Sequence, residues 1–444
     1  MTPIAAASST PLVDPRKLLP PATLRQLDNG LTVCALENRR SPVVATALVY
    51  RAGTRDERAS EGGCAHFLEH MMFKGSKNFG PGEIDRLTRA LGGSNNAYTS
   101  HDSTLYYFTF AADRWRQALA IEADRMAGLA LEAKAVESER RVIVEEIAMY
   151  EAEPWDALEQ KVASALFAGH SYGRPVLGTR ESLAGLDGAV LAGFHGRRYR
   201  PDNAVLAVVG DFGDGVLDDV AEAFAGVPRD GALDDPSRAG DGPVPLTEVV
   251  RVERRHGETS RMLLSWRGPA AQDPDHPLVE ILMAILATGR ASRLHRALVD
   301  EGQLCTWVTA DLQETLDPGA ALVALELLAG VEPARVEAQV FEEIDRLRRE
   351  GPSQEELVRA QRILVADWVF GNERVYQQAF LAATSVALFD GEHPWRYFDR
   401  LMAATCEEVH EAARRWLRPR QGAVLGWSLP RSSEGTGNRE GEAG

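Results

Sequence analysis

The chain has 444 residues, of which 44% are hydrophobic and 26% are charged, and its formal net charge is -16. This length exceeds one ordinary domain and predicts at least two, and the composition is typical of a globular protein. The acidic balance argues against a nucleic-acid partner, because binding to phosphates needs a basic surface. The four cysteines are far apart and form no Cys-x-x-Cys pair, so neither a disulfide framework nor a structural zinc knot is expected.

The segment 1–21 is rich in proline, alanine and serine, which predicts a flexible N-terminus. It contains no apolar run of signal-peptide length, and its basic residues are too few for a transit peptide. No segment of the chain approaches the ~20 apolar residues that a membrane span requires. We therefore expect a cytoplasmic protein without a membrane partner.

The first half predicts alternating strands and helices. Asp28-Asn29-Gly30 between a polar and an apolar strand segment indicates a hairpin turn, and Gly92-Gly93 indicates the end of a helix. The expected elements are a hairpin at 25–37, a buried strand at 42–53, helices at 63–73 and 82–93, a β-rich segment at 96–112, helices at 115–129 and 133–150, and a buried strand at 203–212.

A change of composition divides the chain into two domains. The segment 229–246 is rich in Gly, Pro and Asp and has no hydrophobic periodicity, which predicts a linker. It would join a first domain at 22–228 to a second at 247–430. The polar segment 431–444 predicts a disordered tail.

The second half repeats the pattern of the first. The segment "EELVRAQRILVADW" parallels "KAVESERRVIVEEI" at an offset that places Val365 on Val144 and Arg362 on Arg141. Chance similarity of two amphipathic segments is the alternative to a duplication. The second copy has "LVEILMAILATG" where the first has "CAHFLEHMMFKG", so only the first half is expected to carry metal ligands.

The segment "HFLEH" places His66 and His70 four residues apart, on one face of the expected helix. Imidazole suits zinc, and a catalytic zinc needs three protein ligands with one position open for water. Glu69 precedes the second histidine and would lie beside that water, in the order His-x-x-Glu-His. Two histidines can also share a helix by chance, so the metal hypothesis needs a third ligand from elsewhere.

The helix expected at 133–150 supplies candidates for that ligand. Glu139 and Glu146 are seven residues apart and share a face of the helix, whose apolar side includes Ile143 and Ile147. A carboxylate on a buried helix is costly unless it is paired or bound to a metal. We predict Glu146 as the third ligand and Glu139 as a carboxylate that orients a histidine or the water. A solvated face is the alternative interpretation of so charged a helix, and Glu145 is the alternative ligand.

Several segments together resemble the pitrilysin/insulinase family of zinc metallopeptidases. They are "HFLEHMMFKGS", "NAYTSHDSTLYYF", "ERRVIVEE", "SYGRPVLGT" and "RYRPDNAVLAVVGDF". The likeness is closest to the short-chain branch that contains mitochondrial processing peptidase and its bacterial homologues, and it extends over about 22–430. It implies an α+β fold of two similar domains, each a mostly antiparallel sheet covered by helices.

The resemblance also implies a site and an activity. Zn²⁺ would be bound by His66, His70 and Glu146, with Glu69 as general base and Glu139 as a supporting carboxylate. The implied enzyme is a zinc metalloendopeptidase that cleaves peptides or unfolded segments with a zinc-activated water.

Substrate contacts and partners follow from the same resemblance. Asn96, Ala97 and Tyr98 correspond to the strand along which substrate lies. Arg374 and Tyr376 in "NERVYQQAF" are candidates for contacting the substrate carbonyl, although they are closer together than the family's pair. The resemblance implies a homodimer, or a heterodimer with an inactive homologue, around a chamber. The alternative is an inactive structural or partner subunit of the same fold, which the intact metal set disfavours.

Overall fold

The computed structural model describes residues 16, 19–229 and 242–431. The chain forms two compact units, and each unit is built from segments that are separated along the sequence. The first takes its described residues from Met1–Glu145, Arg174–Gly240 and Gln361–Ala403, and the second from Glu146–Gly173, Asp241–Ala360 and Ala404–Gly444.

The predicted domains are contiguous, whereas the observed units exchange segments. Residues 146–173 belong by their contacts to the second unit, and 361–403 belong to the first. The sequence pattern did not indicate this exchange, because periodicity shows that a helix has an apolar face but not which sheet covers it. Most of the predicted flexible N-terminus, linker and tail lies outside the described residues, so those three assignments stay predictions.

The first unit contains a six-stranded sheet in the order β1-β2-β6-β3-β5-β4. Its strands are β1 (Ala22–Gln26), β2 (Thr32–Glu37), β3 (Val43–Tyr50), β4 (Ser94–Thr99), β5 (Thr104–Ala111) and β6 (Ala204–Gly210). β2 and β6 are parallel, and the other neighbours are antiparallel. The predicted hairpin is confirmed as β1–β2. Gly30 has φ +94° in its turn, and a β-carbon there would lie 2.7 Å from the Cβ of Asp202.

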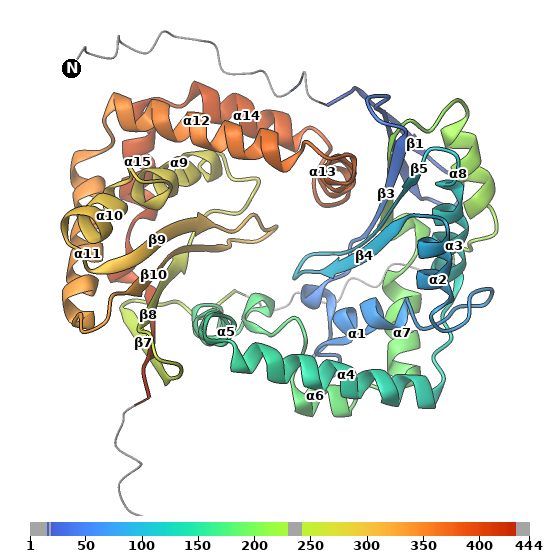
Figure 1. Cartoon of the computed structure of the whole chain (residues 1–444), viewed down its shortest axis with the longest axis horizontal. Helices are drawn as coiled ribbons and strands as arrows, with labels where there is room; N and C mark the ends of the chain where they lie inside the picture. Colours follow the sequence, from blue (N-terminus) through green and yellow to red (C-terminus); the bar gives the residue numbers. More distant parts are fainter. Residues whose placement is uncertain (1–15, 17–18, 230–241, 432–444) are drawn as a thin grey trace, which may run out of the picture. The chain divides into compact units, whose positions relative to one another are not determined.

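Helices cover both faces of this sheet, as Figure 1 shows. Helix α13 packs on β3 and β6 from one side, and α1, α2 and α8 contact the sheet at other strands. The helices of the first unit are α1 (Cys64–Met71), α2 (Glu83–Ala90), α3 (Arg116–Ala127), α4 (Ala133–Ala152), α6 (Arg180–Ala184), α7 (Gly188–Arg198), α8 (Val216–Phe224), α13 (Val375–Leu388) and α14 (His393–Ala403), although α4 continues past the unit boundary.

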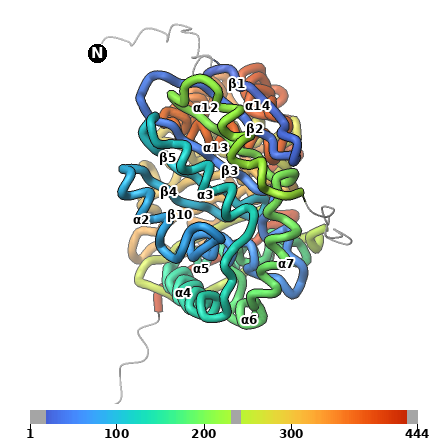
Figure 2. The backbone as a smooth tube through the Cα atoms, turned by 90° about the vertical axis from the view of Figure 1, so that its right-hand side faces the viewer, coloured from blue at the N-terminus to red at the C-terminus, as the bar shows by residue number. Residues whose placement is uncertain are grey.

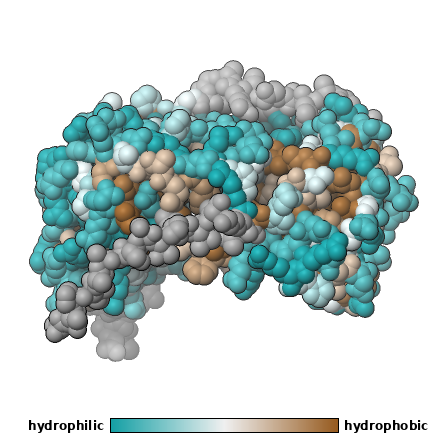
Figure 3. Space-filling model, turned by 90° about the horizontal axis from the view of Figure 1, so that it is seen from above, coloured by the Kyte–Doolittle hydropathy of each residue, from teal (hydrophilic) through white to brown (hydrophobic). Residues whose placement is uncertain are grey.

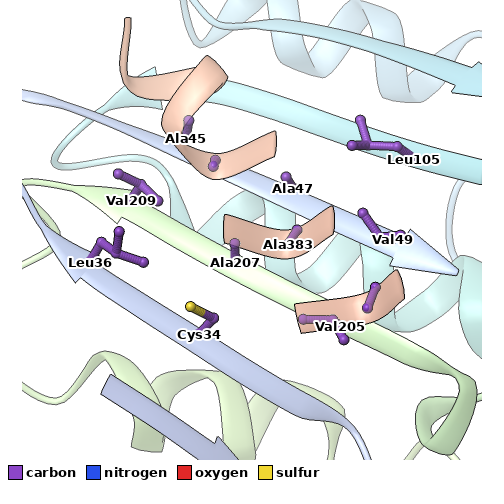
Figure 4. Close-up of a cluster of buried hydrophobic side chains, with 12 residues drawn as sticks. Cys34, Leu36, Ala45, Ala47, Val49, Leu105, Val205, Ala207, Val209 and Ala383 are labelled. Carbon is purple, nitrogen blue, oxygen red and sulfur yellow. The ribbon is translucent and has the colours of Figure 1, made fainter. Parts of the chain in front are cut away.

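Small side chains allow α13 to lie close to the sheet. Ala379, Ala383 and Ala387 are fully or almost fully buried in a cluster with residues of β2, β3, β5 and β6. In Figure 4, Ala383 lies over the strands that carry Ala47 and Ala207. Alanine loses no side-chain entropy on burial and lets the helix backbone approach the strands. This face of α13 can therefore pack directly on the sheet.

The second unit repeats the topology of the first with one strand fewer. Its sheet has the order β7-β11-β8-β10-β9, with β7 and β11 parallel, which matches β2-β6-β3-β5-β4 strand for strand. The strands are β7 (Val249–Arg255), β8 (Arg261–Arg267), β9 (Cys305–Leu312), β10 (Ala320–Leu327) and β11 (Ala423–Leu429). The helices are α5 (Pro154–Leu166), α9 (His276–Ala287), α10 (Arg293–His295), α11 (Pro333–Glu350), α12 (Gln354–Gly371) and α15 (Cys406–Trp416), although the greater part of α12, residues 361–371, belongs to the first unit.

The two exchanged helices, α5 and α13, pack on equivalent strands of the two sheets. Helix α5 packs on β8 and β11, as α13 packs on β3 and β6. Pro154 and Val375, the first residues of α5 and α13, correspond at the same offset that places Val365 on Val144 in the sequence. The prediction of two similar α+β domains, each a mostly antiparallel sheet with helices, is therefore confirmed.

The surface is mostly polar on the face seen in Figure 3, where hydrophobic residues form separate patches. Among the residues that the structure describes, no helix is both long and apolar enough to cross a membrane.

A buried ion pair lies inside α3. Arg125 donates from Nε and Nη2 to the two carboxylate oxygens of Glu122 at 2.8 and 2.6 Å, and both side chains are almost inaccessible. The guanidinium also lies over the ring of Tyr106, 4.5 Å from its centroid. Burial raises the pKa of Glu122, although the arginine opposes that shift.

We predict that Arg125→Met lowers the free energy of unfolding by about 3–5 kcal/mol, because it leaves a carboxylate buried without its counter-charge. Urea unfolding measures the loss. The double variant Glu122→Met/Arg125→Met should recover most of it. Arg116→Met serves as the control, because Arg116 lies on the same helix with its side chain 49% exposed. This variant should lower the free energy of unfolding by less than about 1 kcal/mol. A single Arg125 variant as stable as the wild type would contradict this account.

Candidate metal centre

The start of α1 is fixed by close backbone packing and a buried carboxyl group. Gly63 precedes α1 with φ +88°, and a β-carbon there would lie 2.8 Å from the carbonyl oxygen of Leu177. The carboxyl group of Glu57 accepts hydrogen bonds from the backbone N–H groups of Gly63 at 3.1 Å and Ala65 at 2.9 Å. It thereby satisfies donors that the first turn of a helix leaves unpaired.

The two histidines of α1 face the same space. Their ring centroids are 4.7 Å apart; His66 is buried and His70 is half-buried. His70 Nδ1 lies 2.9 Å from Oε1 of Glu139. An ionised carboxylate only accepts hydrogen bonds, so His70 must be the donor in this contact. Nδ1 therefore carries the proton, and Nε2 of His70 keeps a lone pair for a metal.

Glu139 is itself held between two partners. Lys74 Nζ lies 2.8 Å from its second oxygen, Oε2. Burial opposes ionisation of this carboxyl, but the hydrogen bonds from His70 and Lys74 outweigh that effect and hold the pKa of Glu139 below its usual value. Glu139 therefore stays a carboxylate near neutral pH, as an acceptor for a histidine ligand must.

Glu146 completes the set two turns further along α4. Among the described residues, His66, His70 and Glu146 can offer one ligand atom each, and all three atoms lie within 4.8 Å of one another. The boundary between the two units falls between Glu145 and Glu146, within one continuous helix, so α4 itself places Glu146 relative to Glu139. Glu145 is exposed, whereas Glu146 is half-buried.

This donor set fits zinc. Two imidazole nitrogens and one carboxylate oxygen are the ligand types of a catalytic zinc site, which keeps a further position for water. The carboxylate behind His70 supplies the outer contact that zinc-binding histidines usually have. The structure thus brings together the three residues predicted as ligands, together with the predicted supporting carboxylate.

The side chain of Glu69 reaches from α1 to the edge of the first sheet. Its Oε2 accepts a hydrogen bond from the Thr99 hydroxyl at 2.5 Å, and Thr99 is the last residue of β4. The predicted substrate residues Asn96, Ala97 and Tyr98 also lie on β4, which ends the sheet and pairs with β5 on one side only. The side chain of Tyr98 is 65% exposed. Their role in binding substrate stays a prediction.

Arg374 and Tyr376 lie at the start of α13. Arg374 is the exposed N-cap residue, and Tyr376 stacks on Tyr107 of β5 with ring centroids 5.8 Å apart. Tyr107 pairs with Asn96, so Tyr376 lies on the face of the sheet to which Asn96 points. The contacts found for these two residues do not include a metal ligand, and their proposed substrate role stays untested.

Two residues next to the site were not found from the sequence. Glu57 lies seven residues before α1, outside the range in which capping signals are read, and Thr99 has the ordinary composition of a strand end. Only the fold brings these residues to α1.

Comparison with known proteins identifies the family. Residues 32–180 match the family model described as Insulinase (Peptidase family M16), and residues 186–364 match the one described as Peptidase M16 inactive domain. An uncharacterized zinc protease of Mycobacterium tuberculosis is 32% identical over 380 residues, which span 84% of this chain and 85% of that protein. The chain therefore belongs to peptidase family M16.

Two further relatives extend the comparison. The probable mitochondrial-processing peptidase subunit beta of Schizosaccharomyces pombe is 30% identical over 271 residues, which are 60% of this chain and 59% of that protein. The crystal structure of a protease from Helicobacter pylori matches with a TM-score of 0.87 at 22% identity, and it covers 93% of this chain and 100% of that chain. The latter similarity shows the fold alone.

We predict that Glu146→Gln weakens zinc binding, because an amide oxygen is a poorer ligand than a carboxylate oxygen. Zinc content after dialysis against a graded chelator measures the change. Glu145→Gln, one residue earlier and exposed, is the matched control and should bind zinc like the wild type. Normal zinc binding by Glu146→Gln together with loss in Glu145→Gln would show that the other carboxylate is the ligand.

A second prediction concerns Glu57. Burial raises the pKa of its carboxyl from 4.5 to about 8, while the two backbone hydrogen bonds and Arg174 oppose the shift and Glu61 adds to it. Between these values the folded state holds a proton that the unfolded state has lost, so this group makes the protein less stable as pH rises. The stability advantage of the wild type over Glu57→Gln should therefore shrink from pH 4.5 to about 8. Denaturant unfolding across this range tests it; a constant or growing advantage would contradict it.

Proposed function

We propose that the protein is a zinc-dependent endopeptidase. The observation that carries this proposal is the group of His66, His70 and Glu146, with their ligand atoms within 4.8 Å of one another and Glu69 between the two histidines in sequence. The names of two mycobacterial relatives, each called an uncharacterized zinc protease, support it. A carboxylate beside a three-ligand zinc site is the arrangement of metal-assisted peptide hydrolysis.

The chain's own residues account for the proton transfers. When bound, zinc supplies Lewis acidity, which makes attack by water on a peptide carbonyl possible near neutral pH. Glu69 accepts the proton that the attacking water releases and then returns it to the departing amine. Glu139 fixes His70 in the tautomer that leaves Nε2 for the metal.

The proposed substrates are peptides or unfolded segments that add to the sheet as a further strand. Strand β4 has one paired edge, to β5, and it carries Asn96, Ala97 and Tyr98. Pairing of main chain with main chain gives affinity that depends little on sequence. A folded substrate could not offer an extended backbone to this edge.

The second half of the sequence supplies no ligand in this proposal. Helix α12 corresponds to α4, and at the offset of the sequence repeat it has Asp367 for Glu146 and Ala360 for Glu139. Among the described residues, the cluster of three side chains that could hold a metal ion lies on α1 and α4. We propose that the second half of the chain serves substrate enclosure, and that a second chain, identical or an inactive homologue, completes the chamber. The alternative of an inactive partner subunit is disfavoured because all five residues of the site are present.

We predict that Glu69→Gln retains zinc but loses turnover by about two to four orders of magnitude, because it removes a base and not a ligand. Cleavage of a quenched fluorescent peptide library and zinc content are the two measurements. Glu145→Gln is the control for both. Chelation should abolish wild-type turnover and zinc should restore it. A wild-type rate in Glu69→Gln would refute the mechanism, and a zinc-loaded wild type without turnover on any peptide would refute the function.

The proposed partner chain leads to a prediction about concentration. A closed chamber excludes water and holds the substrate, so dissociation of the partner should lower hydrolysis. We expect light scattering to show a dimer and the specific activity to fall on dilution into the nanomolar range. A monomer with full specific activity at that concentration would exclude the required partner.

A further inference from the structure

We infer that Thr99 is a positioning residue for the general base: its hydroxyl holds one oxygen of Glu69 and so orients the carboxylate that acts on water. The inference deepens the proposed function and rests on it. It concerns the orientation of one side chain, which the metal ligands alone do not determine.

Burial and strand pairing fix the position of the Thr99 side chain. Thr99 is only 6% exposed, and its backbone lies at the end of the β4–β5 ladder, paired with Thr104. Its Oγ1 donates to Glu69 Oε2 at 2.5 Å. A hydroxyl donates one hydrogen and an ionised carboxylate only accepts, so the direction of this bond is settled by chemistry. Hydrogen bonds to a charged acceptor are among the stronger ones in proteins.

The alternation of β4 explains why Thr99 is the residue that reaches the base. Side chains of successive strand residues point to opposite faces. Asn95 donates to Asp85 and Thr88 of α2, so Asn95 and Thr99 share the face on which the helices α1 and α2 lie. Asn96 and Tyr98 point to the other face. Thr99 is thus a direct link between the strand proposed to bind substrate and the carboxylate proposed to attack through water.

Because of this hydrogen bond, the two carboxylate oxygens of Glu69 have different roles. Oε2 is occupied by the Thr99 hydroxyl and can remain so throughout a cycle. The other oxygen, Oε1, forms the new O–H bond as the water's O–H bond breaks, and later gives that proton to the amine nitrogen. Without the hydroxyl, the glutamate side chain gains rotational freedom, and the fraction of time in which it points at the water falls.

Loss of the Thr99 hydroxyl should lower turnover more than substrate binding. Thr99→Val keeps the shape and the strand backbone but removes the donor. The kcat should fall about 10- to 100-fold, in line with the cost of a misplaced catalytic group. KM should change less than about threefold, because the main chain of β4 still presents the same edge to substrate. Thr99→Ser returns the hydroxyl and should restore kcat to within about threefold of the wild type.

The experiment compares wild type, Thr99→Val and Thr99→Ser, with Thr109→Val as the control. Thr109 pairs with Ser94 at the opposite end of the β4–β5 ladder, so its variant tests the strand without touching Glu69. For each protein we would measure zinc content, kcat and KM, and determine the crystal structure of the metal-free form. The Glu69 carboxylate should be displaced or disordered in Thr99→Val and ordered as in the wild type in the other two variants.

Each outcome either supports or overturns the role inferred for Thr99. An unchanged kcat in Thr99→Val, or a Glu69 carboxylate in the wild-type position there, overturns the inference. Loss of zinc or of folding in Thr99→Val that serine does not rescue overturns it too, because the role would then be structural. If the zinc-loaded wild type cleaves no peptide, the proposed function fails, while the position of Glu69 in the metal-free crystals still tests whether Thr99 holds it.

Discussion

The contact between His70 Nδ1 and Glu139 Oε1 joins α1 to α4, and the metal centre depends on it. The ligands come from two helices distant in sequence, so a site exists only if these helices keep one relative position. The contact does this while fixing the histidine tautomer. Helix α4 is further held to the first unit where Arg140 donates to the carbonyl oxygens of Leu183 and Leu186, beside α6 (Figure 2). Glu146 needs no separate anchor, because it follows on the same helix.

Comparison of the two repeats separates the features of the shared fold from those of the candidate metal site. Strand order, parallel pairing and the exchanged helix recur in both. The metal ligands predicted from the sequence lie in the first copy alone, and the match of the second half to a model described as an inactive domain agrees with that difference. The alanines of α13 keep one face of the first sheet closed, while the other face carries α1.

Local spacing predicted most of the site. His66 and His70 follow from one helical turn, and Glu146 follows from Glu139 by two turns on an apolar helix. Strands and helices were also found from periodicity, and the repeat between the two halves of the sequence predicted the shared topology. The exchange of α5 and α13 was not predictable, because an apolar helix face is compatible with either sheet. Thr99 and Glu57 were missed for a related reason: each acts through a contact that only the assembled sheet and loop create.

The most direct test of the account is the position of the metal itself. Crystals of the zinc-loaded protein, measured on both sides of the zinc absorption edge, would locate it by anomalous scattering. We expect one zinc per chain with nitrogens of His66 and His70 and an oxygen of Glu146 at about 2.0–2.2 Å, and with Nε2 of His70 as one of those nitrogens. A zinc that binds elsewhere, or one that takes His70 by Nδ1 and separates it from Glu139, would contradict the account.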